Sequence, residues 1–261
     1  MELRAIVTGA SSGIGRDIAR QLASRGVELV LVARREDRLI QLASELPVPA
    51  EGIPCDLADP GACVELHRRV SERPVDILVN DAGFGVFGAF DETDLQRELD
   101  LIDVNIRALH ILTKLFYRDF VARGSGRILN VSSSAGFMPG PLLSSYYASK
   151  AYVLRLTEAL HEELRRMGSP VTVSAFCPGP VSTEFDAVAD VRFSVRGISS
   201  ERAARAAVDG LFRGRLVIVP GLQMKAAHVG SRLLPDRLML RLTWHMQRRK
   251  MRDSSVGKEI P

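Results

Sequence analysis

Short apolar runs alternate with longer stretches of helical periodicity along most of the chain. The runs that predict strands are residues 4–8, 28–33, 51–56, 75–79, 126–131, 171–176 and 216–219. They stay apolar without alternation, which is typical of strands buried on both faces of a parallel sheet. Helical periodicity follows the first run through residue 25. It then recurs at residues 36–45, 61–72, 94–123, 146–167 and 200–213, with a break near 103–105.

This order predicts an α/β protein with a Rossmann-type, doubly wound parallel sheet of about seven strands. We expect residues 1–220 to form a single domain with this fold. Residues 221–253 should add a basic, amphipathic helical extension to that domain, and residues 254–261 a disordered tail.

The composition fits one intracellular globular domain. The chain has 261 residues, of which 46% are apolar and 25% charged. It shows neither a membrane-spanning run nor a signal peptide. Cys55, Cys63 and Cys177 have no pairing or ligand spacing, so we expect a reducing, cytoplasmic setting without disulfides or a metal site. A net charge of +4 does not by itself imply nucleic-acid binding, and we expect none.

A glycine-rich loop joins the first strand to the first helix. It contains Gly9, Gly13 and Gly15, with Ser11 and Ser12 between them. Glycines allow the backbone to approach a pyrophosphate, and the following helix N-terminus presents free N–H groups to it. A tight turn is the alternative, but the position between strand and helix favours a nucleotide site.

The second predicted strand ends at Ala33 and is followed by Arg34 and Arg35. An acidic residue there would bind the ribose 2′-hydroxyl of NAD, whereas a guanidinium suits the 2′-phosphate of NADP. We therefore predict a preference for NADP(H) over NAD(H), the alternative being that both arginines face solvent. Asp56, after the third strand, is placed to reach the adenine.

Tyr146 and Lys150 lie four residues apart at the start of a long predicted helix, so they share one face of that helix. Three serines, at positions 132–134, follow the end of a predicted buried strand. A phenol can donate a proton to a carbonyl oxygen, and a neighbouring ammonium lowers its pKa. A serine hydroxyl can stabilise the charge that develops on that oxygen. This set suits ketone reduction, although an exposed Tyr–Lys pair is an ordinary alternative.

Taken together, these motifs resemble those of the short-chain dehydrogenase/reductase family over residues 4–183. The matching residues, in the order of the family's motifs, are Thr8-Gly9-x-x-x-Gly13-Ile14-Gly15, Asn80-x-Ala82-Gly83, Asn105, the serine cluster, Tyr146-x-x-x-Lys150 and Pro178-Gly179-x-x-x-Thr183.

The resemblance implies a role for each site residue. Tyr146 would be the general acid/base, Lys150 would lower its pKa and hold the nicotinamide ribose, and Asn105 would kink its helix and anchor a relay water. Ser133 would be the catalytic serine, being 13 residues before Tyr146, although Ser132 and Ser134 stay open. The implied cofactor contacts are Gly9, Ser11, Ser12, Ile14, Gly15, Asp56, Leu57, Asn80, Ala82, Gly83, Pro178, Gly179, Val181 and Thr183, in addition to Arg34, Arg35, Tyr146 and Lys150.

Two positions next to the motifs stand apart. Asp81 replaces the second Asn usual in the family, and we expect little effect of this change on catalysis. Tyr147 points about 100° around the helix from Tyr146, so we expect it to serve packing.

The substrate-binding residues are less well defined. Residues 184–196, where the family places its substrate loop, include Phe185, Val188, Val191 and Phe193 as candidate walls of an apolar pocket. The further candidates are Phe84, Val86, Phe87, Met138, Leu142 and Leu143. Such a pocket indicates a small hydrophobic carbonyl or alcohol substrate.

Residues 223–253 carry eight Lys/Arg against two Asp. Residues 237–252 carry a broad apolar arc that includes Leu242, Trp244 and Met246. We expect this segment to cap the cleft or to pack in an oligomer; peripheral membrane contact and disorder are less favoured alternatives. The resemblance implies a homodimer or homotetramer.

The sequence thus predicts an NADP(H)-dependent oxidoreductase that interconverts a ketone or aldehyde and an alcohol. A 3-oxoacyl-thioester reductase is the alternative among enzymes. An NADP(H)-sensing regulatory protein is the alternative outside them.

Overall fold

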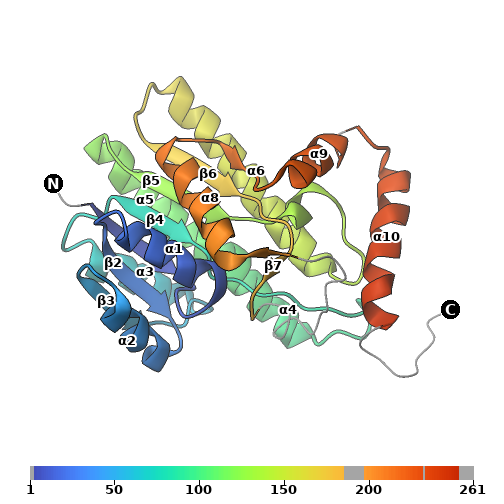
Figure 1. Ribbon diagram of the computed structural model, residues 1–261, viewed down its shortest axis with the longest axis horizontal. Helices are drawn as coiled ribbons and strands as arrows, with labels where there is room; N and C mark the ends of the chain where they lie inside the picture. The colour runs from blue at the N-terminus through green and yellow to red at the C-terminus, as the bar shows by residue number, and fades with distance from the viewer. Residues whose placement is uncertain (1–2, 185–196, 232, 253–261) are drawn as a thin grey trace.

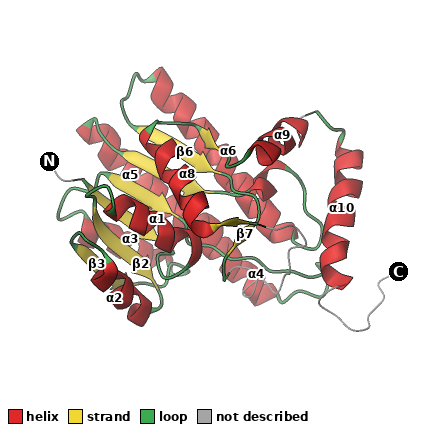
Figure 2. Cartoon of the chain, in the orientation of Figure 1, coloured by secondary structure: helices red, strands yellow, loops and turns green. Residues whose placement is uncertain are grey.

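The computed structural model describes residues 3–184, 197–231 and 233–252. Its centre is a parallel sheet flanked by helices on both faces (Figures 1 and 2). In spatial order the seven strands are β3 (Ala50–Pro54), β2 (Glu28–Ala33), β1 (Arg4–Thr8), β4 (Ile77–Asn80), β5 (Arg127–Val131), β6 (Thr172–Phe176) and β9 (Val217–Ile218). The predicted doubly wound sheet of about seven strands is therefore confirmed.

Residues on the two sides of each strand belong to two separate cores. Ala5 and Val7 face the helices α1 (Gly13–Ala23) and α8 (Ser200–Phe212), whereas Ile6 between them faces α5 (Leu109–Arg123) and neighbouring helices. The helices are α1 (Gly13–Ala23), α2 (Glu36–Glu45), α3 (Pro60–Val70), α4 (Leu95–Ile102), α5 (Leu109–Arg123), α6 (Ser144–Arg166), α8 (Ser200–Phe212), α9 (Leu222–Ser231) and α10 (Asp236–Arg252). This two-sided burial explains why the strand sequences are apolar without alternation.

The strand order reverses between β1 and β4, because β1 pairs with β2 on one side and with β4 on the other. In open α/β sheets a ligand crevice forms at this switch point, outside the carboxyl ends of the strands. The glycine loop after β1 and the segment after β4 both begin there. The topology thus brings the predicted motifs to one edge of the sheet.

The break predicted near residues 103–105 is a π-helix, Asp103–Ala108, between α4 and α5. Two features were not predicted: α9 as a separate helix, and a small parallel pair, β7 (Val181–Ser182) with β8 (Ile198–Ser199). Elsewhere the element ends shift by a few residues; the third strand, for example, is Ala50–Pro54, so Cys55 to Leu57 follow it.

The predicted extension forms the helices α9 and α10, which stand at one end of the sheet (Figure 1). Met239, Thr243 and Gln247 recur every four residues along α10 and are buried, so this stripe faces the protein. No helix in the described parts of the chain combines the length and hydropathy needed to cross a membrane. The predicted tail, 254–261, and most of the predicted substrate loop, 185–196, lie outside the described residues.

Candidate active site

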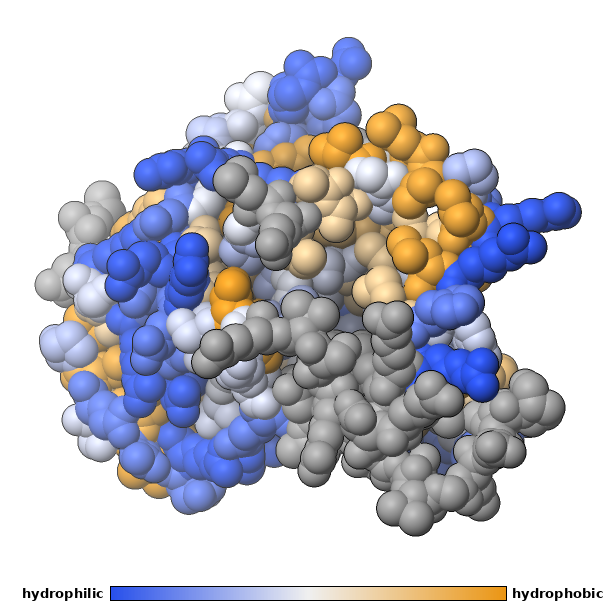
Figure 3. Space-filling model, turned by 45° about the vertical axis from the view of Figure 1, so that its right-hand side comes forward, coloured by the Kyte–Doolittle hydropathy of each residue, from blue (hydrophilic) through white to orange (hydrophobic). Residues whose placement is uncertain are grey.

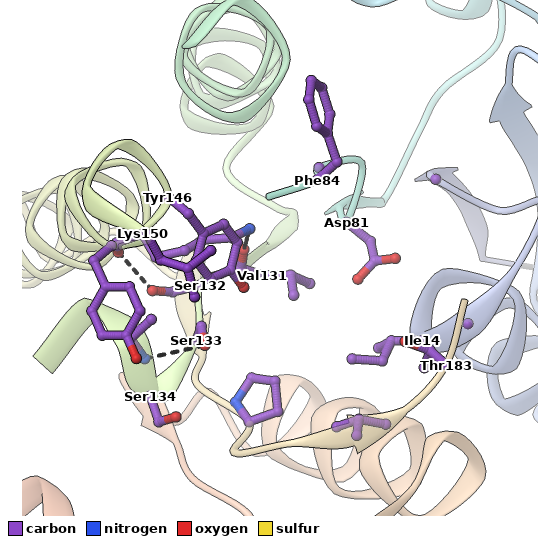
Figure 4. A pocket seen from close by; sticks show the side chains of 18 of the residues that line it. Ile14, Asp81, Phe84, Val131, Ser132, Ser133, Ser134, Tyr146, Lys150 and Thr183 are labelled. Carbon is purple, nitrogen blue, oxygen red and sulfur yellow. Dashed lines mark hydrogen bonds between the residues drawn. The ribbon is translucent and has the colours of Figure 1, made fainter. Parts of the chain in front are cut away.

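A cleft of about 1000 Å³ opens at the carboxyl ends of the strands and reaches from the glycine loop to α10. Most of the predicted site residues line it. They are Gly9, Ser11, Ser12, Ile14, Arg34, Arg35, Asp56, Leu57, Ala82, Gly83, Ser133, Tyr146, Lys150, Pro178, Gly179, Val181 and Thr183. Figure 4 shows Tyr146 and Lys150 on one side of this cleft, with Ile14 and Thr183 across from them.

Three predicted site residues lie outside the cleft lining. The amide nitrogen of Asn80 points into the interior, where it donates to Oγ1 of Thr113 at 3.0 Å and to Oδ1 of Asn130 at 2.9 Å. Gly15 lies behind Asp81, and a Cβ on Gly15 would come within 2.6 Å of that carboxylate. These two residues therefore shape the nucleotide site from behind.

Asn105, the third such residue, is 1% exposed within the π-helix. Its Oδ1 accepts from the backbone N–H of Phe84 at 3.0 Å, and its Nδ2 donates to the Phe84 carbonyl at 2.9 Å and to Oγ of Ser149 at 3.0 Å. The side chain thus clamps the loop after β4 onto α6. The helix irregularity was predicted; the relay water stays a prediction.

The glycine loop fits closely against the turn after β4. Gly9 has φ +71°, and a Cβ there would lie 2.9 Å from the backbone nitrogen of Ala82, so a side chain is excluded. Thr8, which belongs to the first motif but was given no role from the sequence, holds the same turn: its Oγ1 accepts from the N–H groups of Asp81 at 3.1 Å and Ala82 at 3.2 Å.

The three serines have different contacts. Ser132 is buried and donates to the backbone carbonyl of Lys150 at 2.7 Å, which fixes β5 to α6. Ser134 begins a short 3-10 helix. Ser133 shares a side-chain hydrogen bond with Tyr146 and accepts from the N–H of Ala135 at 3.1 Å. The geometry therefore favours Ser133 as the serine beside the phenol.

Burial in the cleft raises the pKa of the Tyr146 phenol, and the hydrogen bond from Ser133 only partly offsets this. Desolvation also lowers the pKa of Lys150, whose Nζ donates to the Val131 carbonyl at 2.9 Å and lies 5.8 Å from the Tyr146 ring centroid. Desolvation thus dominates the pKa of Tyr146 in this arrangement, and the lowering of that pKa by Lys150 stays a prediction.

Asp81 was expected to matter little, yet its carboxylate accepts from the N–H of Gly15 and faces the Lys150 ammonium. Desolvation raises the pKa of Asp81, and its negative charge in turn raises those of Lys150 and Tyr146. The substitution for the usual Asn thus introduces a carboxylate whose charge influences both of the proposed catalytic groups.

The two arginines after β2 differ in their contacts. Arg34 is exposed at the rim of the cleft. The Nη2 of Arg35 donates to Oγ of Ser11 at 3.1 Å and of Ser12 at 3.0 Å, and its Nη1 donates to Glu184 at 3.0 Å. One guanidinium and two hydroxyls therefore converge beside the glycine loop.

The far end of the cleft is apolar. Of the predicted wall residues, Phe84, Met138 and Leu143 line it. Val86, Phe87 and Leu142 do not, and Phe185, Val188, Val191 and Phe193 lie outside the described residues. The remaining lining residues come from the extension and were not singled out as walls: Met224, Ala227, Leu234, Met239, Leu242 and Met246. The extension thus covers the cleft, as the cap prediction required.

Residues 4–191 match the family model described as short chain dehydrogenase. A Streptomyces violaceoruber protein named "Granaticin polyketide synthase putative ketoacyl reductase 1" is 41% identical over 186 residues, which cover 69% of this chain and 68% of that protein. A short-chain dehydrogenase from Sphingobium yanoikuyae in complex with NADPH aligns with a TM-score of 0.79 at 31% identity, covering 99% of this chain and 98% of that one. A Burkholderia phymatum structure in complex with NAD has a TM-score of 0.80 at 23% identity, with the same coverage, and supports the fold alone.

Proposed function

Because the chain belongs to the short-chain dehydrogenase family, we propose that it uses NADP(H) to interconvert a hydrophobic ketone or aldehyde and the corresponding alcohol. The observation that carries this proposal is the meeting of Ser133, Tyr146 and Lys150 in one cleft that also contains the glycine loop. The nicotinamide cofactor would supply the hydride. The chain's own groups would bind the substrate oxygen and handle its proton.

Tyr146 would donate the proton to the substrate oxygen during reduction. Since burial raises its pKa, the phenol holds its proton at neutral pH and can act as a donor. Ser133, in hydrogen-bond contact with that phenol, would also donate to the oxygen as negative charge develops there. Lys150 would stabilise the phenolate that remains.

The preference for NADP(H) is supported by Arg35 with Ser11 and Ser12. A guanidinium and two hydroxyls at the end of β2 match the acceptor oxygens of a 2′-phosphate, with which arginine forms charge-assisted hydrogen bonds. Arg34, exposed at the same rim, adds positive charge. The structural neighbour with bound NADPH is consistent with this preference.

A 3-oxoacyl thioester reductase is the second candidate. The relative whose name includes ketoacyl reductase favours it. The exposed positive charges of Lys225, Arg237 and Arg241, on α9 and α10, also favour it. The phosphate of an acyl carrier would need such charges at the entrance of the cleft.

The proposed setting is the reducing cytoplasm, since Cys55, Cys63 and Cys177 are all free thiols. Assembly as a homodimer or homotetramer remains a prediction from the family resemblance.

The test is NADPH oxidation by purified Tyr146→Phe across acyl, steroid and aromatic ketones. The variant should lose at least about 100-fold in kcat while it still binds NADPH, because general acid–base groups contribute on the order of 10²–10⁴ in rate. Tyr152→Phe, which removes a phenol from the same helix outside the cleft lining, should keep full activity. A wild-type protein that binds NADPH tightly and turns over no substrate would favour a sensing role instead.

A further inference from the structure

Next to the reacting phenol, a hydrogen bond joins α6 to the extension. Nε2 of Gln247, on α10, donates to the hydroxyl oxygen of Tyr147, on α6, at 2.5 Å. Gln247 is 1% exposed, whereas Tyr147 is half-buried and lines the cleft. The amide therefore holds the phenol from behind, and the phenol faces the space where a substrate would lie.

This pair retains hydrogen-bonding capacity that the described residues do not use. The Tyr147 oxygen accepts from the amide, so its own hydrogen remains available for donation. The Oε1 of Gln247 is buried and has no partner among the described residues.

The Tyr147 ring is held in place by its neighbours. A Cβ on Gly140 would lie 2.3 Å from the Cγ and Cδ2 atoms of that ring, so the ring lies directly against the glycine backbone. On its other side it meets the Tyr146 ring edge-on, with centroids 6.2 Å apart. The second phenol is thus fixed relative to the one that is proposed to protonate the substrate.

The surroundings of this polar pair are apolar. Met138, Leu143 and Met246 also line the cleft, and Figure 3 shows apolar surface on the side of the molecule where α9 and α10 lie. A buried polar group without a partner is unfavourable, and a phenylalanine–methionine pair would fill the same volume without that penalty. The packing expected of Tyr147 is therefore only part of its role.

We propose that Tyr147, supported by Gln247, is a substrate-binding residue that donates a hydrogen bond to a second oxygen of the substrate. This inference rests on the proposed reductase function and narrows the substrate class. The preferred substrates would be apolar carbonyl compounds with another acceptor oxygen near the reacting carbonyl, such as the acyl carbonyl of a 3-oxoacyl compound. Burial raises the pKa of Tyr147, so it stays a neutral donor throughout the physiological range.

The experiment compares two probes with NADPH: an alkyl 3-oxo ester and the plain ketone of the same chain length. Their kcat/KM ratio is measured for the wild type, Tyr147→Phe, Gln247→Met and the control Tyr152→Phe, whose hydroxyl contacts His110 instead. Because the intrinsic reactivities of the probes cancel between variants, a change in the ratio reports on the subsite alone.

Tyr147→Phe should reduce the preference for the oxo ester by about five- to tenfold, mainly through KM for that probe. Gln247→Met should give a smaller loss in the same direction, and Tyr152→Phe none. If Tyr147→Phe still turns over the plain ketone and its kcat/KM ratio for the two probes equals that of the wild type, the proposed role of Tyr147 is wrong, whereas the reductase function is not affected. If the wild type reduces neither these probes nor any ketone of the wider panel, the proposed function fails and the subsite with it.

Discussion

Replacing Arg35 by alanine is expected to weaken NADPH binding much more than NADH binding. Its guanidinium bonds both loop serines and Glu184, and it lines the cleft at the end of β2. NADPH and NADH differ only in the 2′-phosphate. A side chain that contacts this phosphate must therefore affect one cofactor selectively.

The size of the effect follows from the exposure of the side chain and from its present partners. A hydrogen bond to a charged group contributes about 1.5–3 kcal/mol to binding. The Arg35 side chain is 41% exposed, which screens the interaction and favours the lower part of that range. A 2′-phosphate would also compete with Glu184, whose pKa is lowered by Arg38 and Arg35. We therefore expect a loss of about 1.5–2 kcal/mol, roughly 10- to 30-fold in the Kd for NADPH.

The assay is a fluorescence or calorimetric titration of each variant with NADPH and with NADH at fixed ionic strength. Arg38→Ala is the matched control, because Arg38 also pairs with Glu184 but does not line the cleft. It should leave both affinities unchanged, and Arg34→Ala should give a smaller selective loss than Arg35→Ala. Equal losses of NADPH and NADH affinity in Arg35→Ala would refute the assignment of the 2′-phosphate to this residue.

Two further predictions concern the other parts of the cleft. Asp81→Asn keeps an acceptor for the Gly15 N–H but removes the charge that raises the pKa of Lys150. The pKa of Lys150 should therefore fall, and the alkaline limb of the pH profile of kcat/KM should move to lower pH. An alkaline limb at the same pH as in the wild type would contradict the electrostatic coupling between Asp81 and Lys150. Ending the chain before Arg237 removes Leu242 and Met246 from the cleft wall, so KM for apolar ketones should rise about tenfold at an unchanged Kd for NADPH. If the full-length protein sediments with anionic vesicles and the shortened protein does not, the result would instead support the membrane alternative.

Much of the architecture could be predicted because burial on both faces leaves a distinct pattern. β1, β2 and α2 begin and end where the apolar runs and helical periodicity predicted. The helix interruption near Asn105 was also visible, since β-branched and short polar residues there weaken a long helical pattern. By contrast, the two-residue strands β7 and β8 are too short for periodicity to distinguish them, and α9 lies within the predicted helical extension, which was not divided into two helices.

The site was harder to predict wherever several chemically equivalent side chains adjoin. Three consecutive serines have the same sequence signal, and only their hydrogen bonds separate Ser133, beside Tyr146, from Ser132, which is bonded to a backbone carbonyl. Tyr147 and Gln247 are 100 residues apart and meet only through the packing of α10. No local sequence pattern contains such a contact.

Asp81 shows how a substitution that keeps the local geometry can still change the chemistry. An asparagine could accept from the same Gly15 N–H, so the turn after β4 would keep its shape with either residue. The carboxylate differs by one negative charge, inside a cleft where desolvation makes charges interact strongly. That charge favours the protonated forms of both Lys150 and Tyr146. Because burial also raises the pKa of Asp81 itself, to about 7, this charge develops as the pH rises through neutrality, so its effect on Lys150 and Tyr146 depends on pH.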